Sequence, residues 1–164
     1  MMRPLLKKNY LNMIENSVKD QNWMFRNFFV EDNGVEKDVL EDGRLSCAVF
    51  VSSILYLFNS GLEFTSKQRW IKFTHANIPS TEKDMQDSGW YEIKELKPGS
   101  IIIWEKKNAN NSENWHMGFY VGNDVAISND SGKGNTGIPH RHHYTYNDTR
   151  KIEKIYWHPE LDQD

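Results

Sequence analysis

The chain has 164 residues, a formal net charge of -3, and 38% hydrophobic and 13% aromatic residues. This length and apolar content are enough for a domain with a buried core, and they exclude a disordered chain. Lysine and arginine are scattered rather than gathered into a basic stripe, and no run of about 18 apolar residues occurs, so we expect neither nucleic-acid binding nor a membrane span.

The N-terminal third of the chain has a helical pattern. Its apolar residues recur at the spacing of one helix face, at Leu6, Tyr10, Met13, Ile14 and Val18. An aromatic-rich stretch over residues 23–29 follows, and we predict a helical extension over about residues 1–35. The first residues are basic but lack the apolar run of a signal peptide. On this ground we expect a cytoplasmic protein, while export by another route stays open.

The most apolar segment of the sequence runs from Leu45 to Asn59. Its apolar residues cover nearly every face, and the segment is too long for an ordinary strand. We therefore predict a buried helix that ends near Ser60 and Gly61, where the glycine can terminate it. A shorter helix is predicted around residues 66–73.

After the turn signal at Asp87-Ser88-Gly89, the apolar period changes from helical to alternating. Residues 101–104 read as a central strand, and residues 152–157 as the last strand. Between them, two runs over 115–121 and 125–128 are joined by Gly122-Asn123-Asp124, a hairpin signal. Helices first and antiparallel strands second predict an α+β fold, in one domain over residues 1–164.

Cys47 is the only cysteine, which excludes an intramolecular disulfide and a four-cysteine zinc site. It lies at the start of the predicted buried helix. There the unpaired N–H groups and the helix dipole stabilise a thiolate, and the same N–H groups can receive an oxyanion. The alternative is a buried structural cysteine, which is common in proteins.

His116 lies in the first strand of the predicted hairpin. Alternation places Met117, Phe119 and Val121 on the core face, and His116, Gly118 and Tyr120 on the other. A glycine neighbour leaves room around the ring, although an ordinary strand histidine would look the same. A cysteine at a helix start and a histidine on a strand are the pair that thiol hydrolases use. We therefore expect the Cys47 sulfur to approach a His116 ring nitrogen to roughly 3–4 Å.

Three blocks of the sequence, in this order, resemble a known family. They are Gly43-Arg44-Leu45-Ser46-Cys47-Ala48-Val49-Phe50-Val51, Leu96-Lys97-Pro98-Gly99-Ser100-Ile101-Ile102-Ile103-Trp104, and His116-Met117-Gly118-Phe119-Tyr120-Val121-Gly122-Asn123. The set is similar to the nucleophile helix, the Pro-Gly-Asp strand start and the His-x-Gly-x-Tyr-x-Gly hairpin of NlpC-type cell-wall cysteine peptidases, in the papain-like superfamily. The resemblance covers about half of the chain, from Asp42 to Asp130.

The resemblance implies a papain-like NlpC-type fold, with N-terminal helices packed on an antiparallel sheet. It implies a cysteine peptidase or amidase that hydrolyses amide bonds in peptidoglycan stem peptides, with Cys47 as nucleophile, His116 as base and an acyl-enzyme intermediate. No cofactor or metal is implied. Two positions depart from the family, because Ser46 and Ser100 stand where the family has aspartates. These departures bear on the substrate more than on the chemistry.

A third polar residue should orient the imidazole by binding its other nitrogen. The family places it about twelve residues beyond the base, and counting leads to Ser128, followed by Asn129. A three-residue hairpin loop over 122–124 would put Ser128 on the His116 face. A two-residue loop over 123–124 would put Asn129 there instead. Both residues are therefore candidates.

Other features leave alternatives open. His140, His142 and His143 form a histidine cluster that could suggest a metal site or the rim of a cleft. No cysteine accompanies them as a further metal ligand, so we predict no metal.

Trp104 and Trp115 could stack on a ligand or belong to the core. The same Cys–His pair could serve an acyltransferase or deamidase with an intracellular substrate, and a non-catalytic relative would bind peptide or glycan without turnover. The sequence does not predict the oligomeric state.

Overall fold

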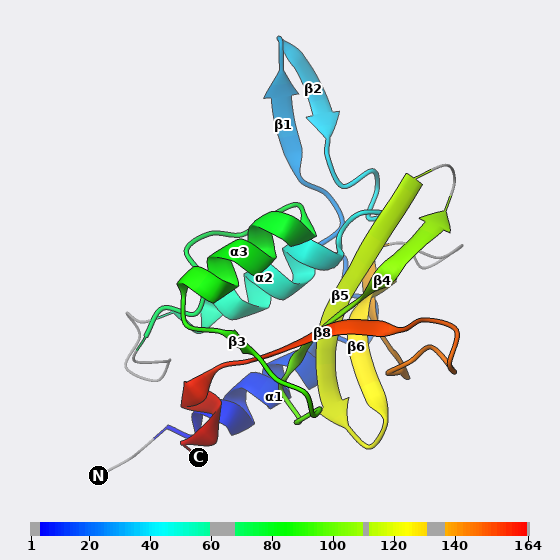
Figure 1. The fold of residues 1–164 in the computed structure, drawn as a ribbon. Helices are drawn as coiled ribbons and strands as arrows, with labels where there is room; N and C mark the ends of the chain where they lie inside the picture. The colour runs from blue at the N-terminus through cyan, green and yellow to red at the C-terminus, as the bar shows by residue number, and fades with distance from the viewer. Residues whose placement is uncertain (1–3, 60–67, 110–111, 131–136, 164) are drawn as a thin grey trace.

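A computed structural model describes residues 4–59, 68–109, 112–130 and 137–163. Six antiparallel strands form one sheet, in the spatial order β3 (Tyr91–Glu92), β8 (Ile152–Trp157), β4 (Ile101–Ala109), β5 (Ser112–Gly122), β6 (Val125–Asp130) and β7 (Ile138–His143). The helices are α1 (Leu6–Asn16), α2 (Cys47–Leu57), α3 (Ile78–Asp87) and the short 3-10 helix η1 (Pro159–Asp162). Helices α2 and α3 lie on one face of the sheet (Figure 1). The predicted α+β class with an antiparallel sheet is confirmed.

The core fills the space between this sheet face and the helices. Phe50 of α2 meets Phe119 of β5 edge-on, with ring centroids 5.4 Å apart. Tyr10 of α1 also packs edge-on against Phe119 at 5.8 Å, and its hydroxyl donates a hydrogen bond to the Gly99 carbonyl at 3.2 Å. Aromatic side chains bury large areas, so these contacts fix α1 and α2 on β5, the strand that carries His116. No helix within the described residues has the length and apolar character needed to cross a membrane.

The predicted buried helix is confirmed as α2, and the predicted central strand as part of β4. Seven of the eleven residues of α2 are buried, which agrees with apolar side chains on nearly every face of this helix. The helix ends at Leu57, while the predicted stop at Ser60 and Gly61 lies outside the described residues.

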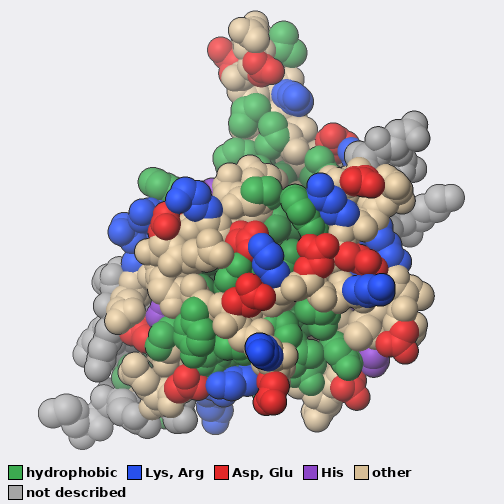
Figure 2. Space-filling view, viewed as in Figure 1, with side chains coloured by type: hydrophobic (Ala, Val, Ile, Leu, Met, Phe, Trp, Pro, Cys, Tyr) green, Lys and Arg blue, Asp and Glu red, His purple; other side chains and the backbone are tan. Residues whose placement is uncertain are grey.

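The helical extension over about residues 1–35 is wrong beyond Asn16. The Ser17 hydroxyl binds the Ile14 carbonyl at 2.6 Å where the helix ends, so it competes with the backbone ladder. Strands β1 (Phe29–Asp32) and β2 (Val35–Asp38) then form a two-stranded hairpin that stands out from the body (Figure 1). Hydrophobic side chains remain visible along it in Figure 2. Of the aromatic residues that suggested a helix over 23–29, only Phe25 belongs to the core, whereas Trp23, Phe28 and Phe29 are exposed.

The short helix predicted around residues 66–73 is also wrong over the described part, 68–73, and α3 takes its place further along the chain. The start signal of α3 is Asn77, whose side chain accepts a hydrogen bond from the Ser80 N–H at 2.9 Å. Pro79 lies in the first turn, where its missing N–H has no cost. The helix was missed because its apolar stripe is narrow, although this cap can be read from the sequence.

The β5–β6 hairpin combines features of both predicted registers. Its loop has two residues, Asn123 and Asp124, so that Gly122 pairs with Val125. A bulge between Tyr120 and Gly122 then adds one residue to β5, and Tyr120 pairs with Ala126. The bulge restores the register of the three-residue alternative, which places Ser128 on the face of His116.

Gly118 lies where β4, β5 and β6 approach one another closely. A Cβ atom at this position would lie 2.5 Å from the Ile127 carbonyl oxygen, 2.7 Å from Ser128 Cβ and 3.2 Å from Trp104 Cη2. Two of these atoms belong to β6, which cannot move without disturbing the sheet. The sequence context suggested that Gly118 leaves open space around the His116 ring, but the described atoms around Gly118 leave no such space. The glycine instead lets Ser128 approach β5.

We predict that Gly118→Ala destabilises the protein by about 1–3 kcal/mol, as overpacking does elsewhere, and separates Ser128 from His116. Chemical denaturation measures the first effect. The control is Gly34→Asn in the β1–β2 turn, because nothing lies within 4 Å of a Cβ there and asparagine tolerates the positive φ of 80°. Equal stability of Gly118→Ala and wild type would contradict the tight packing.

Candidate active site

A pocket of about 340 Å³ contains both predicted catalytic residues. Cys47 reaches it from the first residue of α2, and His116 from β5. The pocket also includes Lys106 and Lys107, beside the register shift in β4 between Trp104 and Lys107. Regular pairing with β5 is interrupted there, and we attribute the opening of the pocket at this place to that irregularity.

The Cys47 thiol is held in its neutral form. Burial raises its pKa, and this effect outweighs the opposing influence of the Met117 and Ala48 N–H groups and of the Arg150 charge. Cys47 keeps part of its surface exposed in the pocket, so water reaching the pocket moderates the shift. The helix start supplies the expected N–H groups, but the unliganded protein does not favour the thiolate that the sequence predicted.

His116 is also neutral. Burial lowers the pKa of its ring well below the ordinary value, and the charge of Arg150 adds to this effect, as do His142 and His140 whenever they are protonated. The ring is 7% exposed and stacks on Trp104, with centroids 5.5 Å apart. The resting pair is therefore a thiol and a neutral imidazole, not an ion pair. A neutral imidazole can act as a general base.

Ser128 is the polar residue that the structure brings to His116. Its Oγ lies 2.8 Å from His116 Nε2. The same oxygen lies 2.9 Å from His142 Nε2 and 3.1 Å from the Tyr146 hydroxyl. A serine hydroxyl has one proton to donate and two lone pairs, so these three contacts satisfy it completely.

The donors and acceptors in this network can be assigned by starting from His142. His142 Nδ1 lies 2.9 Å from the His143 carbonyl oxygen, which only accepts, so Nδ1 carries the proton. In a neutral ring His142 Nε2 is then an acceptor, and the Ser128 hydroxyl donates to it. The Ser128 lone pairs remain for the Tyr146 hydroxyl and for His116 Nε2–H. This tautomer leaves His116 Nδ1 unprotonated and able to take a proton.

The other ring nitrogen is not yet bonded to the thiol. Within the described part of the chain, no hydrogen bond joins the Cys47 sulfur to the His116 ring, although both residues contribute to the same pocket. The two residues are thus brought together at the pocket, without the hydrogen-bonded contact that we expected. Catalytic hydrogen bonds are often long in unliganded enzymes and tighten in the substrate complex.

Asn129 lies on the opposite face from the imidazole. Its side-chain amide donates to Ser46 Oγ at 3.0 Å and to the Gly137 carbonyl at 3.2 Å. Ser46 directly precedes Cys47, and its own hydroxyl donates to the Gly43 carbonyl at 2.7 Å. Asn129 therefore connects β6 to the start of α2 and positions the backbone next to Cys47. Of the two candidates for orienting His116, the structure brings Ser128 to the ring.

The histidine cluster lies on strand β7. His140 Nδ1 donates to the Ser128 carbonyl at 2.9 Å, and its ring packs 4.9 Å from that of His142. Both histidines stand behind Ser128 and do not line the pocket. The residues described by the structure contain no group of three or more metal-binding side chains. Trp104 is buried under His116, whereas Trp115 lines the pocket.

Arg150 was missed by the sequence analysis. It follows β7 in a loop, with no local pattern to mark it, and it reaches the pocket beside Cys47 and His116. Its Nε donates to the Glu105 carbonyl at 3.1 Å and its Nη2 to the Asn114 carbonyl at 2.9 Å. The guanidinium thereby joins β4 to β5 where their regular pairing is interrupted.

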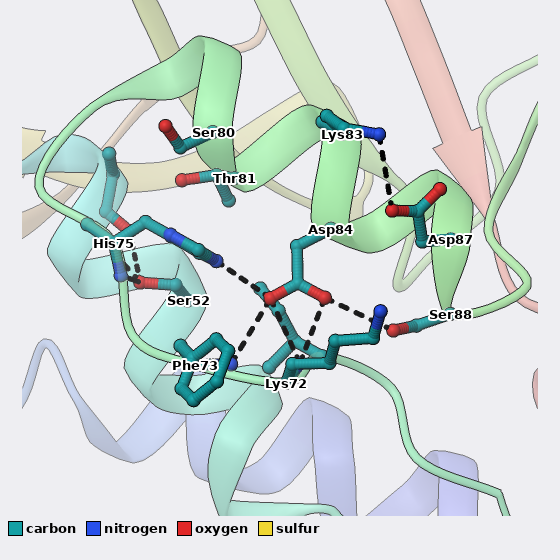
Figure 3. Close-up of polar contacts among 12 residues, drawn as sticks. Ser52, Lys72, Phe73, His75, Ser80, Thr81, Lys83, Asp84, Asp87 and Ser88 are labelled. Atoms are coloured by element: carbon teal, nitrogen blue, oxygen red, sulfur yellow. Dashed lines mark hydrogen bonds and ion pairs between the residues drawn. The ribbon is translucent and has the colours of Figure 1, made fainter.

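The opposite wall of the pocket depends on a second network, shown in Figure 3. Asp84 of α3 accepts hydrogen bonds from the Lys72 and Phe73 N–H groups at 3.0 and 3.1 Å, and its Oδ2 lies 2.7 Å from His75 Nε2. The backbone N–H of His75 in turn donates to Ser52 Oγ of α2 at 2.9 Å. These bonds hold the segment directly before pocket residues 76–79. No pattern in the sequence identifies Asp84 as the partner of His75.

No protein-family model matches the chain, and no curated protein matches it. Its function is therefore inferred from the residues of the site and from the motifs in the sequence.

We predict that Asp84→Asn lowers the free energy of unfolding by about 1–3 kcal/mol near neutral pH, because a buried charged acceptor of several hydrogen bonds is lost. Burial alone raises the pKa of Asp84, but the bonds from His75, Lys72 and Phe73 outweigh it, so its pKa is lowered. The stabilisation is therefore complete above about pH 4 and disappears as the pH falls through the folded-state pKa.

Urea unfolding of both proteins between about pH 3 and pH 7 measures this difference. The control is Asp87→Asn on the same helix, because Asp87 forms only an exposed pair with Lys83 and should change stability little. A gap between Asp84→Asn and wild type that is the same at both ends of the pH range would contradict the assignment.

Proposed function

We propose that this protein is a cysteine hydrolase that cleaves amide bonds, with Cys47 as nucleophile and His116 as general base. The observation that carries the proposal is the hydrogen bond from His116 Nε2 to Ser128, which leaves Nδ1 as the basic nitrogen of a ring that shares a pocket with the thiol. A nucleophile, a base and a residue that orients the base are the three parts that this chemistry needs.

In the proposed reaction His116 Nδ1 accepts the thiol proton as the sulfur attacks the substrate carbonyl. The N–H groups of Met117 and Ala48 act on the sulfur and stabilise the negative charge that develops on it as the proton leaves. The imidazolium then protonates the departing amine, and the C–N bond breaks to leave an acyl-enzyme on Cys47. Water, deprotonated by the same Nδ1, attacks the thioester. The C–S bond breaks, the acid is released, and the imidazolium returns its proton to the Cys47 sulfur.

A papain-like NlpC-type domain is the architecture that we propose for this site. Its support is that the three motif blocks fall on α2, on β4 and on the β5–β6 hairpin, in the expected order. By resemblance, the substrate is the peptide stem of peptidoglycan. The site has the size of a small ligand pocket, which suits a short peptide rather than a folded protein.

Digestion of purified muropeptides and of a general peptide library tests the proposal, with product masses read by mass spectrometry. We expect wild type to cleave an amide bond, and Cys47→Ala and His116→Ala to lose the activity. A reaction with added hydroxylamine identifies acyl transfer, since capture gives a hydroxamate in place of the acid. Identical product spectra for wild type and Cys47→Ala, with no hydrolysis or transfer, would contradict the proposal.

The network behind Ser128 yields a second test of the same site. We predict that His142→Leu reduces kcat at least about tenfold, because the Ser128 proton loses its acceptor and turns toward His116 Nε2, which forces the ring proton onto Nδ1. His142→Gln should retain most activity, because its carbonyl oxygen can accept in place of Nε2. His143→Gln is the control, since His143 does not touch Ser128. Equal losses in Leu and Gln variants would contradict this hydrogen-bond order.

A further inference from the structure

The pocket is cationic although the chain is acidic. Its formal net charge is -3, yet four cationic side chains and one carboxylate line the pocket, namely Arg44, Lys106, Lys107, Arg150 and Glu113. Fields of one sign are focused in clefts with low-dielectric walls. The pocket therefore attracts anions more strongly than the protein as a whole.

Arg150 is the pocket cation whose charge acts on both the Cys47 thiol and the His116 ring. Arg44 is instead paired with Glu41, and the Lys106 ammonium lies over the Trp115 ring, 4.0 Å from its centroid. These two charges are already partly engaged.

The Arg150 guanidinium is positioned but not neutralised. Its two hydrogen bonds go to backbone carbonyls, those of Glu105 and Asn114. Within the described residues no carboxylate lies at ion-pair distance from it, and the Glu105 carboxylate accepts from the Lys151 N–H instead. An arginine has five N–H donors, so donors remain for a ligand.

The loop before Arg150 is built to hold it. Tyr146, Asn147 and Asp148 all have left-handed backbones, with φ of 52°, 54° and 62°. The Arg150 N–H donates to the Thr145 carbonyl at 3.1 Å, across this turn. The turn therefore fixes Arg150 on one side and brings the Tyr146 hydroxyl to Ser128 on the other. Such strained turns are retained where they position functional groups.

We infer that the pocket binds an acyl substrate with a carboxylate close to the scissile amide, and that Arg150 is the residue that receives this carboxylate. That the bound molecule is cleaved rests on the proposed function, whereas the binding of a carboxylate by Arg150 does not. Arginine suits this task because its planar fork matches a carboxylate. A neutral substrate would leave a guanidinium charge in the pocket without an anionic partner.

Two alkylating reagents that differ only in charge test the inference without any substrate. Iodoacetate carries a carboxylate next to its reactive carbon, whereas iodoacetamide is neutral, and both alkylate the Cys47 thiolate. The ratio of their rate constants cancels the thiolate fraction, so a change in the Cys47 pKa does not affect it. Glutathione, labelled under the same conditions, supplies the ratio for an unassisted thiol.

We expect the ratio of iodoacetate to iodoacetamide rates in wild type to exceed that of glutathione by roughly tenfold, the lower end of the enrichment that charged clefts produce. Arg150→Gln should return the ratio to the glutathione value, and Arg150→Lys should retain part of the enrichment. The control is Arg141→Gln, because Arg141 pairs with Glu15 on the surface and lies outside the pocket.

The outcomes separate the two proposals. A wild-type ratio equal to that of glutathione, or one unchanged in Arg150→Gln, overturns the carboxylate site even if muropeptides are cleaved. If Arg150→Gln slows both reagents equally, the carboxylate site is also overturned, and Arg150 serves only to stabilise the thiolate. An enriched ratio without any peptide cleavage supports the binding site while the hydrolase proposal fails. Thermal unfolding of Arg150→Lys and Arg150→Gln shows whether both variants are folded, and the comparison is made with Arg150→Lys if Arg150→Gln is not.

Discussion

The hydrogen bond between Ser128 Oγ and His116 Nε2 is the contact on which the proposed chemistry depends. It exists because the bulge in β5 shifts the hairpin register by one residue and because Gly118 has no Cβ to keep Ser128 away. A shift of one residue would turn Asn129 toward the ring and Ser128 toward α2. The sheet register therefore determines the tautomer of the His116 ring, since the group that binds Nε2 decides whether Nδ1 carries the proton.

Burial and the helix start have opposite effects on the pKa of the Cys47 thiol. The N–H groups around Cys47 favour a thiolate, but removing the thiol from water favours the neutral form, and the second effect is larger. The same burial keeps His116 uncharged. The protein thus rests as a neutral pair, and charge separation is expected only when a substrate carbonyl is present to receive the sulfur. A buried ion pair at rest would have to offset the desolvation of both groups.

The sequence allowed the layered fold to be predicted because the apolar period changes once, from helical to alternating, and because α2 is apolar on all faces. It could not decide between Ser128 and Asn129, since both hairpin loops were compatible with the residues and only the pairing of β5 with β6 reveals the bulge. Helix α3 was overlooked because its evidence was a cap, Asn77, rather than an apolar stripe. Arg150 and the partnership of His75 with Asp84 are products of tertiary folding, which no local pattern reports.

The most direct test of this account is the tautomer of His116, measured by ¹⁵N NMR of the full chain with labelled histidine and assigned with His116→Ala. The hydrogen-bond order through His142 and Ser128 predicts a neutral ring at about pH 7, protonated at Nε2 and unprotonated at Nδ1. A ring protonated at Nδ1, alone or together with Nε2, could not accept the Cys47 proton. That result would contradict the assignment of His116 as the general base.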